Sequence, residues 1–199
     1  MALNLHTPGK GLLETHISWD DIEQRIREER NLEVSFGPKK SVHRIGEDKG
    51  FMSRIAVIEP DFEGEVDGLP EKFALKMVCI LASVEIAESV KERHGEPMSS
   101  EEILEEYDRN TRLLHNREVN VYRVFSRFDN SISKMPLVYF SKGYTDNNDV
   151  KGYIGMEFVE NAEFRHVYHN IKPEELSSVR IIQCLLLPNS LRICRIFVV

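Results

Sequence analysis

The strand-type and helix-type segments of this chain occur in blocks, and this order constrains its fold more than any other feature. A helical segment follows Ser18, then come three strand-type segments, further helical segments, two more strand-type segments and a last helix from about Pro173. Strict alternation would indicate a parallel sheet with crossover helices, whereas blocks favour an antiparallel sheet. The sequence therefore predicts an α+β fold, with a five-stranded antiparallel sheet and one long helix.

Local signals set the bounds of these elements. Ser18 and Asp21 resemble a capping box at the start of the first helix, which is expected to close at Asn31. The segment 72–79 alternates its apolar residues with the period of a strand, and 60–70 is expected to be an acidic loop. The other expected helices span 81–91 and 99–128, and the strands span 41–45, 51–59, 72–79, 137–141 and 152–159.

Composition excludes several classes of protein. Hydrophobic residues make up 41% and charged residues 30%, as in a globular domain, and the formal net charge of -7 argues against a nucleic-acid-coating surface. Three cysteines without a CxxC pair indicate neither a disulfide framework nor a zinc site, so no metal site is expected. The sequence has no signal-peptide pattern and no apolar run of about 18–20 residues. We therefore expect a cytoplasmic protein that does not bind membranes.

One residue of the long helix is charged although its neighbours on the same helix face are apolar. Leu114, Glu118, Val121 and Phe125 have the spacing of a single helix face, so a carboxylate stands in an otherwise apolar stripe. A buried carboxylate needs a cation or a donor nearby. Lys76, on the third strand-type segment, has the matching need. We therefore predict a Lys76–Glu118 ion pair between strand and helix.

These elements come in the order of a protein-kinase-like N-terminal lobe. In such a lobe a Gly-bounded turn covers phosphates, a strand lysine holds them, a helix glutamate orients the lysine, and a connector after the fifth strand meets adenine. Taken singly, each feature has an ordinary structural alternative: a hairpin turn, a solvated lysine, or a salt bridge at a helix edge. Their common order favours the kinase-like interpretation. The expected turn is Gly46–Gly50, and the expected connector is 156–159.

Several blocks also resemble a known family. FGPKKSVHRIGEDKGFMSRIAVIEPDF, LPEKFALKM, LHNREVNVYRVF and GYIGMEFVEN look like the nematode CHK-kinase-like proteins, relatives of ecdysteroid kinases, choline kinases and aminoglycoside phosphotransferases. The resemblance covers about residues 12–178. It implies ATP as cofactor and transfer of phosphate to a hydroxyl of a small molecule. It also implies two catalytic residues, Lys76 and Glu118, and the nucleotide-binding residues Gly46, Gly50, Phe51, Met52, Ser53, Ala74, Lys76, Met156, Glu157, Phe158 and Val159.

The chain departs from this family in two respects. Asp48 stands in the turn where a glycine is more often expected, and its carboxylate should weaken ATP binding. The family's catalytic loop, a His-x-Asp followed by an Asn, and its metal-binding Asp belong to a C-terminal lobe that we do not find in this sequence. Magnesium is therefore expected only with an intact C-terminal lobe, and the chain itself is expected to be inactive.

The resemblance gives an expected domain organisation. A helical extension covers 1–36, the kinase-like N-terminal lobe 37–160, and the start of a linker or C-terminal-lobe helix 161–178. The remaining segment, 179–199, has no acidic residue but two of the three cysteines. This change of composition indicates a divergent tail, from a truncated or frame-shifted end.

Two other functions remain open at this point. A non-catalytic interaction module would use the face that normally packs on the C-terminal lobe, leaving it exposed for a protein partner. An unstable fragment would have no function. The expected partners are a nucleotide and an acceptor molecule that the sequence does not identify, with no nucleic acid and no membrane.

Overall fold

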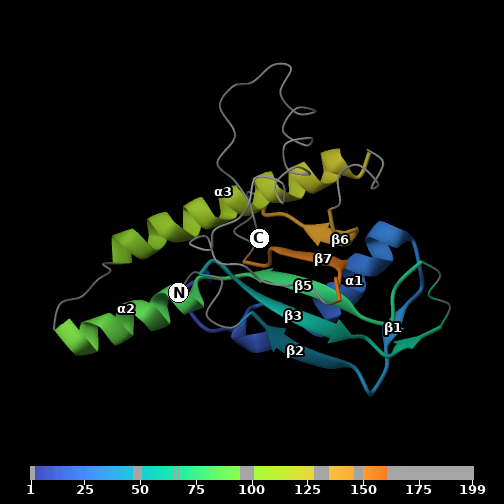
Figure 1. The fold of residues 1–199 in the computed structure, drawn as a ribbon, viewed down its shortest axis with the longest axis horizontal. Helices are drawn as coiled ribbons and strands as arrows, with labels where there is room; N and C mark the ends of the chain where they lie inside the picture. Colours follow the sequence, from blue (N-terminus) through green and yellow to red (C-terminus); the bar gives the residue numbers. More distant parts are fainter. Residues whose placement is uncertain are drawn as a thin grey trace, which may run out of the picture.

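The protein was analysed as a computed structural model that describes residues 3–46, 51–64, 66, 68–94, 101–127, 135–145 and 150–160, without the side chains of 90–94. Figure 1 shows the arrangement of the elements within these ranges. The helical elements are η1 (Leu12–Glu14), α1 (Trp19–Arg30), α2 (Leu81–His94) and α3 (Glu101–Phe125). The strands are β1 (Ser35–Phe36), β2 (Ser41–Ile45), β3 (Ser53–Glu59), β4 (Phe62–Glu63), β5 (Phe73–Val78), β6 (Val138–Lys142) and β7 (Tyr153–Glu157).

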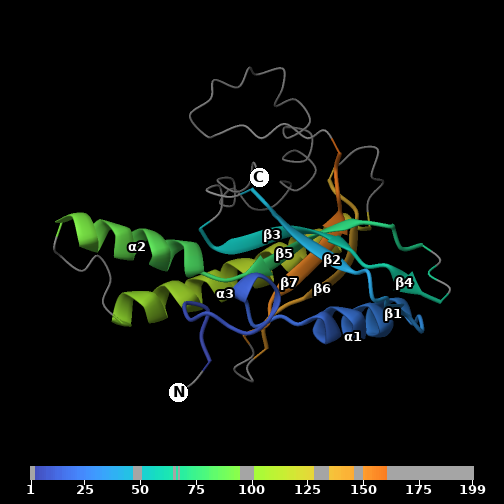
Figure 2. The same ribbon diagram turned by 90° about the horizontal axis from the view of Figure 1, so that it is seen from below.

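The five longer strands form one sheet in the order β2-β3-β5-β7-β6, and every neighbouring pair is antiparallel. This confirms the predicted α+β class with a five-stranded antiparallel sheet. The hairpin of β2 and β3 pairs Ile45 with Ile55, and β5 lies at the centre of the sheet. The long helix α3 packs against β5 and β6 of this sheet (Figures 1 and 2). This arrangement is consistent with a protein-kinase-like N-terminal lobe.

One face of the sheet forms the main core with α1. Phe73, Leu75 and Met77 point to the same side of β5 and share an apolar cluster with Ile22 and Ile26 of α1. Because side chains alternate along a strand, the residues between them point to the opposite face. The alternation predicted for 72–79 is therefore confirmed, and it separates a core face from a second face of the sheet.

The start and end of α1 follow the sequence signals. The Ser18 backbone N–H donates to Asp21 Oδ2 at 2.8 Å, and the Asp21 N–H donates back to Ser18 Oγ at 3.2 Å. This is the predicted capping box. The helix ends where Asn31 adopts the left-handed conformation, with φ of 53°. Asparagine tolerates this conformation better than most residues.

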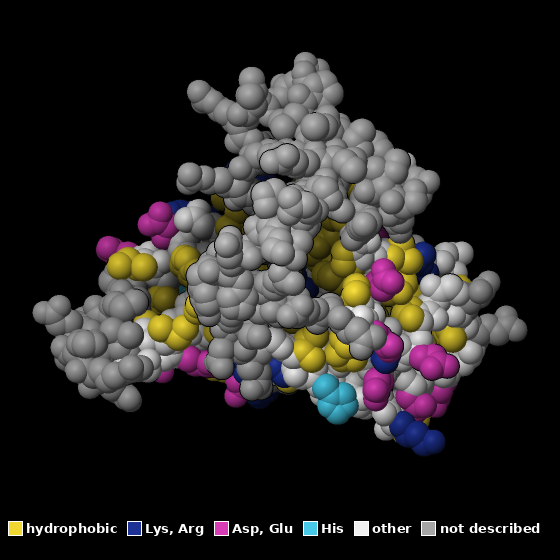
Figure 3. All heavy atoms as spheres, viewed as in Figure 1, with side chains coloured by type: hydrophobic (Ala, Val, Ile, Leu, Met, Phe, Trp, Pro, Cys, Tyr) yellow, Lys and Arg dark blue, Asp and Glu magenta, His cyan; other side chains and the backbone are white. Residues whose placement is uncertain are grey.

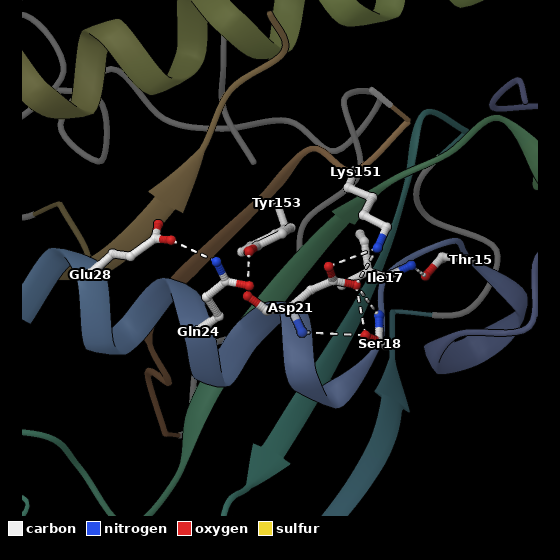
Figure 4. A network of polar contacts seen from close by, with 8 residues as sticks. All are labelled: Thr15, Ile17, Ser18, Asp21, Gln24, Glu28, Lys151 and Tyr153. Carbon is white, nitrogen blue, oxygen red and sulfur yellow. Dashed lines mark hydrogen bonds and ion pairs between the residues drawn. The ribbon is translucent and has the colours of Figure 1, made fainter. Parts of the chain in front are cut away.

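Asp21 also ties α1 to the sheet (Figure 4). Lys151, just before β7, donates to Asp21 Oδ1 at 2.7 Å and to Oδ2 at 2.8 Å. The hydroxyl of Tyr153 donates to the Asp21 carbonyl at 2.7 Å. Burial acts to raise the pKa of the Asp21 carboxyl, but the hydrogen bonds from Lys151 and Ser18 outweigh it, so its pKa is lowered.

The lowered pKa of Asp21 predicts how stability depends on pH. A carboxyl with a folded pKa below its unfolded value stabilises the fold above the unfolded pKa, about 3.9, and this contribution is lost as the pH falls through the folded pKa. Asp21→Asn is expected to lower the free energy of unfolding by about 1 kcal/mol at pH 7, and the deficit should shrink under acid conditions. Urea denaturation of wild type and variant at pH 7 and at an acid pH measures this deficit. Asp20→Asn, on an exposed residue of the same helical turn, is the control, and an equal, pH-independent loss in both variants would contradict the assignment.

Some elements differ from the expectations. The segment 60–70 contains β4, which pairs with β1 through Ser35–Glu63 and Phe36–Phe62, so it is not merely a loop. The second helix runs to His94 rather than ending at 91. The expected helix start at Ser99, the helix from Pro173 and the tail 179–199 lie outside the described residues. Within the described ranges no helix has the length and apolar character needed to cross a bilayer.

Candidate functional site

Lys76 and Glu118 form the centre of the candidate site. Lys76 lies on β5, on the face of the sheet opposite the α1 core, and its Nζ is 2.7 Å from Glu118 Oε1 and 2.8 Å from Oε2. The two side chains retain 18% and 12% of their accessible surface. The predicted ion pair between strand and helix is therefore present. It places α3 over the second face of the sheet.

Glu118 does not lie in the middle of the packed face of α3, where the sequence predicted it to be. The stripe of Leu114, Glu118, Val121 and Phe125 is not the packed face of α3, because Val121 is 45% exposed. The buried residues of α3 are Asp108, Thr111, His115, Val119 and Phe125. Glu118 lies at the edge of this face, where its carboxylate reaches Lys76 while the helix packs through its neighbours.

A cavity of about 280 Å³ lies beside the ion pair, between the start of β3, β5 and α3. It brings together five residues that the sequence assigned to the site. Its lining residues are Phe51, Met52, Ser53, Lys76, Val78, Tyr107, Thr111, Leu114, His115 and Glu118. The lining is largely apolar, with the charged pair at one side, as in many small-molecule sites.

Gly46 directly follows β2, at the start of the predicted turn. Gly46 has φ of +68° and nothing within 4 Å of where a Cβ would be, so the backbone conformation rather than crowding favours glycine there. The cavity-lining residues 51–53 follow the turn directly. Gly50 and Asp48 lie outside the described residues.

Ala74 and Met156 lie on the same face of the sheet as Lys76. Ala74 is paired with Val57 on one side and with Met156 on the other, so three apolar side chains form a row across β3, β5 and β7. Val57 and Met156 are half-buried, while Ala74 is buried. This row lies two residues along β5 from Lys76 and does not line the cavity.

The predicted connector, 156–159, overlaps β7: Met156 and Glu157 belong to the strand, and only Phe158 and Val159 follow it. The Glu157 backbone N–H donates to the Leu137 carbonyl at 2.7 Å, and the Glu157 carboxylate accepts from the Leu137 N–H at 3.1 Å. Phe158 has the Lys72 ammonium 5.3 Å from its ring centroid, and Val159 is exposed. Glu157 is thus engaged with the strand edge, and none of the three lines the cavity.

Sequence reasoning missed the polar side of the cavity. Thr111 and His115 are buried on α3 and line it. Burial lowers the pKa of His115, against the opposing effects of the hydrogen bond with the Lys142 carbonyl and of the Glu118 charge. Burial and the Glu118 charge raise the pKa of Tyr122 to about 12. The only signal in the sequence was the spacing of Thr111 and His115, four residues apart.

The Lys76–Glu118 pair predicts a measurable coupling. Glu118→Met is expected to lower the free energy of unfolding by about 1–3 kcal/mol, because it leaves the Lys76 ammonium without its carboxylate. The double variant Lys76→Met/Glu118→Met removes both charges and should cost less than the sum of the two single variants. Urea denaturation of the four proteins provides this cycle. Additive losses would show that the two side chains do not interact in solution.

Comparison with known proteins identifies a family but no individual relative. No curated protein matches the chain, and no solved structure matches it. A family match covers residues 5–185, which include every described element and the whole candidate site. The chain therefore belongs to the DUF1679 family, described as "Uncharacterized oxidoreductase dhs-27".

Proposed function

We propose that this chain is the nucleotide-binding part of an ATP-dependent small-molecule kinase, in which Lys76 binds the phosphates of ATP. The observation that carries this proposal is the Lys76–Glu118 ion pair at the wall of a cavity that residues 51–53 also line. The same pairing of a strand lysine with a helix glutamate positions the phosphates in protein kinases.

The ion pair leaves the lysine suited to bind an anion. An ammonium has three N–H donors, and the two short contacts of Lys76 go to the two oxygens of Glu118. Glu118 thus fixes the position of the ammonium, and the third N–H can donate to a phosphate oxygen. Because both groups are mostly removed from water, a phosphate there would interact with the ammonium more strongly than at the surface.

The rest of the nucleotide has a matching surface. The row of Val57, Ala74 and Met156 offers apolar contact for a flat base on the same sheet face as Lys76. Along β5 this row is about 6.8 Å from the lysine position, two residues at about 3.4 Å each. The backbone of 158–159 is the proposed partner for the polar edge of the base.

The proposal extends from nucleotide binding to phosphate transfer. The acceptor is a hydroxyl-bearing small molecule, as in the kinases that the sequence resembles. The described residues contain no group of three or more His, Cys, Asp or Glu side chains that could hold a metal ion. In this proposal Lys76 binds the phosphates and Glu118 orients Lys76, while magnesium is expected only with an intact C-terminal lobe.

The word oxidoreductase in the family's description suggests a different ligand, a nicotinamide dinucleotide. Dinucleotide-binding folds place the pyrophosphate at the end of a parallel sheet. Within the described residues the main sheet is antiparallel throughout. The described architecture thus favours ATP over a dinucleotide.

Titration of the full chain with ATP, ADP, AMP and NADPH, each with magnesium, tests the proposal. Calorimetry should show 1:1 binding of ATP and ADP. AMP should bind at least about 10-fold more weakly, because it lacks the second phosphate that the lysine holds. NADPH binding in preference to ATP, or equal affinity for AMP and ATP, would overturn the assignment.

A second candidate function is a non-catalytic interaction module. Ile103, Tyr107, Leu113, Val121 and Val124 are exposed apolar residues of α3. In Figure 3 apolar side chains are visible where Figure 1 draws the N-terminal half of α3. Such a surface could mediate self-association. Sedimentation velocity over a range of concentrations tests it, and a monomer at every concentration would remove the support for self-association.

A further inference from the structure

Asn116 of α3 forms two hydrogen bonds with the backbone of the segment that follows β6. Its Oδ1 accepts from the Tyr144 N–H at 2.7 Å, and its Nδ2 donates to the Tyr144 carbonyl at 3.0 Å. Because a side-chain amide has its acceptor and its donors on different atoms, both bonds form in only one orientation of the Asn116 side chain. This reciprocal contact therefore ties α3 to the segment in one arrangement.

The neighbouring residues of both elements reinforce this contact. His115 Nε2 lies 2.8 Å from the Lys142 carbonyl oxygen, so a second side chain of α3 bonds to the same segment. A Cβ at Gly143 would lie 2.9 Å from Asn116 Oδ1, closer than a Cβ normally approaches another heavy atom. The backbone at Gly143 has no positive φ, so the close approach of Asn116 is the reason that glycine is needed there.

Asn116 and Glu118 extend from different sides of α3. Two residues along an α-helix correspond to about 200° around its axis. Glu118 reaches Lys76 on β5, whereas Asn116 reaches the segment after β6. The buried His115 lies between them on the packed side of the helix. A rotation of the helix that moves Glu118 away from β5 therefore also moves Asn116 away from its backbone partners.

The ion pair depends on this placement of the helix. Lysine and glutamate side chains have much rotamer freedom, and they lose it when they pair. The pair is therefore maintained where the backbones of β5 and α3 are held at the right distance and rotation. Asn116 supplies such a restraint two residues before Glu118, through bonds to main-chain atoms that are themselves fixed next to β6.

We propose that Asn116 is a positioning residue for the Lys76–Glu118 pair. Asn116 does not line the cavity. It sets the rotation of α3, and this rotation determines where Glu118 holds the Lys76 ammonium. The effect on the ion pair follows from the geometry of α3, and only the effect on ATP binding rests on the proposed function.

The double-mutant cycle of the ion pair, measured by urea denaturation of the full chain, tests the proposal without a nucleotide. Asn116→Ala is expected to reduce the coupling between the two charged side chains by at least about twofold. Gly143→Ala crowds Asn116 Oδ1 and should also reduce the coupling. Asn120→Ala, at an exposed asparagine one turn further along α3, makes the same substitution and should leave the coupling unchanged. Ile22→Val in the α1 core should lower stability without changing the coupling.

A spectroscopic readout keeps the proposal testable if a triple variant does not fold. The side-chain ¹⁵N resonance of Lys76, identified by its loss in Lys76→Met, reports whether the carboxylate partner is in place. In Asn116→Ala and in Gly143→Ala this resonance should move toward its position in Glu118→Met. In Asn120→Ala it should keep its wild-type position. An unchanged coupling, or an unchanged Lys76 resonance in Asn116→Ala, would overturn the proposal.

Calorimetric titration with ATP and magnesium separates the positioning role from the nucleotide assignment. Asn116→Ala should weaken ATP binding by about 3- to 10-fold. In the Lys76→Met background it should have no further effect, because Asn116 acts through the lysine. Equal weakening with and without Lys76 would overturn the positioning role. A loss of coupling in a chain that does not bind ATP would support the positioning role and overturn only the nucleotide assignment.

Discussion

Replacing Lys76 with methionine is expected to weaken ATP binding by about 10- to 100-fold. Hydrogen bonds to charged groups contribute about 1.5–3 kcal/mol, and about 1.4 kcal/mol corresponds to tenfold in affinity. Methionine keeps most of the length and apolar character of the lysine stem but removes the ammonium. Calorimetric titration of wild type and variant with ATP measures the change. The variant must first show a cooperative thermal transition, because Glu118 loses its partner as well.

Lys72→Met is the matched control for this experiment. It removes the same charge just before β5, from an exposed side chain that pairs with Glu160 and does not line the cavity. The control should keep ATP affinity within about twofold, since exposed ion pairs contribute little. Equal weakening in both variants would indicate a general charge effect. Wild-type affinity in Lys76→Met would contradict the assignment of Lys76 to the phosphates.

The second large effect concerns stability. Phe140→Ala is expected to lower the free energy of unfolding by about 3–5 kcal/mol. Phe140 on β6 is fully buried, and its ring packs edge-on against Phe73 at 5.4 Å and Tyr153 at 6.3 Å. Gly155 on β7 leaves the space that the Phe140 ring fills. Because a domain of this size is stable by only about 5–15 kcal/mol, the loss should approach global unfolding.

Phe51→Ala provides the control for this loss. Phe51 lines the cavity and is 53% exposed, so its truncation should change stability by no more than about 0.5 kcal/mol. Urea denaturation of wild type, Phe140→Ala and Phe51→Ala measures both losses. The free energies of unfolding can be compared if they depend equally on urea concentration in the three proteins. A loss below about 1 kcal/mol in Phe140→Ala would mean that the ring is not part of the central core.

The sequence predicted most of the fold because local signals were strong there. The capping box at Ser18 and the asparagine at position 31 predicted the two ends of α1. The two-residue alternation from 73 to 78 predicted β5 and the direction of its side chains. The pairing of β1 with β4 was missed because two-residue strands carry no periodic pattern and are defined only by a distant partner. The packed face of α3 was assigned wrongly, since apolar residues at positions such as Val121 are exposed.

The part of the candidate site that the sequence predicted is the ion pair. A carboxylate and an ammonium that both need compensation predicted the Lys76–Glu118 pair, and the structure contains it. The row of Ala74 with Val57 and Met156 depends on strand register, which the sequence alone does not provide. Thr111 and His115 were missed because their burial depends on the rotation of α3 about its own axis. The nucleotide roles of all these residues remain predictions.

Labelling with an acyl phosphate of ATP tests the central claim most directly. This reagent transfers its acyl group to a lysine amine beside the bound phosphates and releases ATP, and mass spectrometry of the digested full chain identifies the modified lysine. The account predicts modification of Lys76 that excess ATP suppresses, while any modification of the exposed Lys72 is unaffected by ATP. Absence of label on Lys76, or label on Lys76 that excess ATP does not reduce, would contradict it.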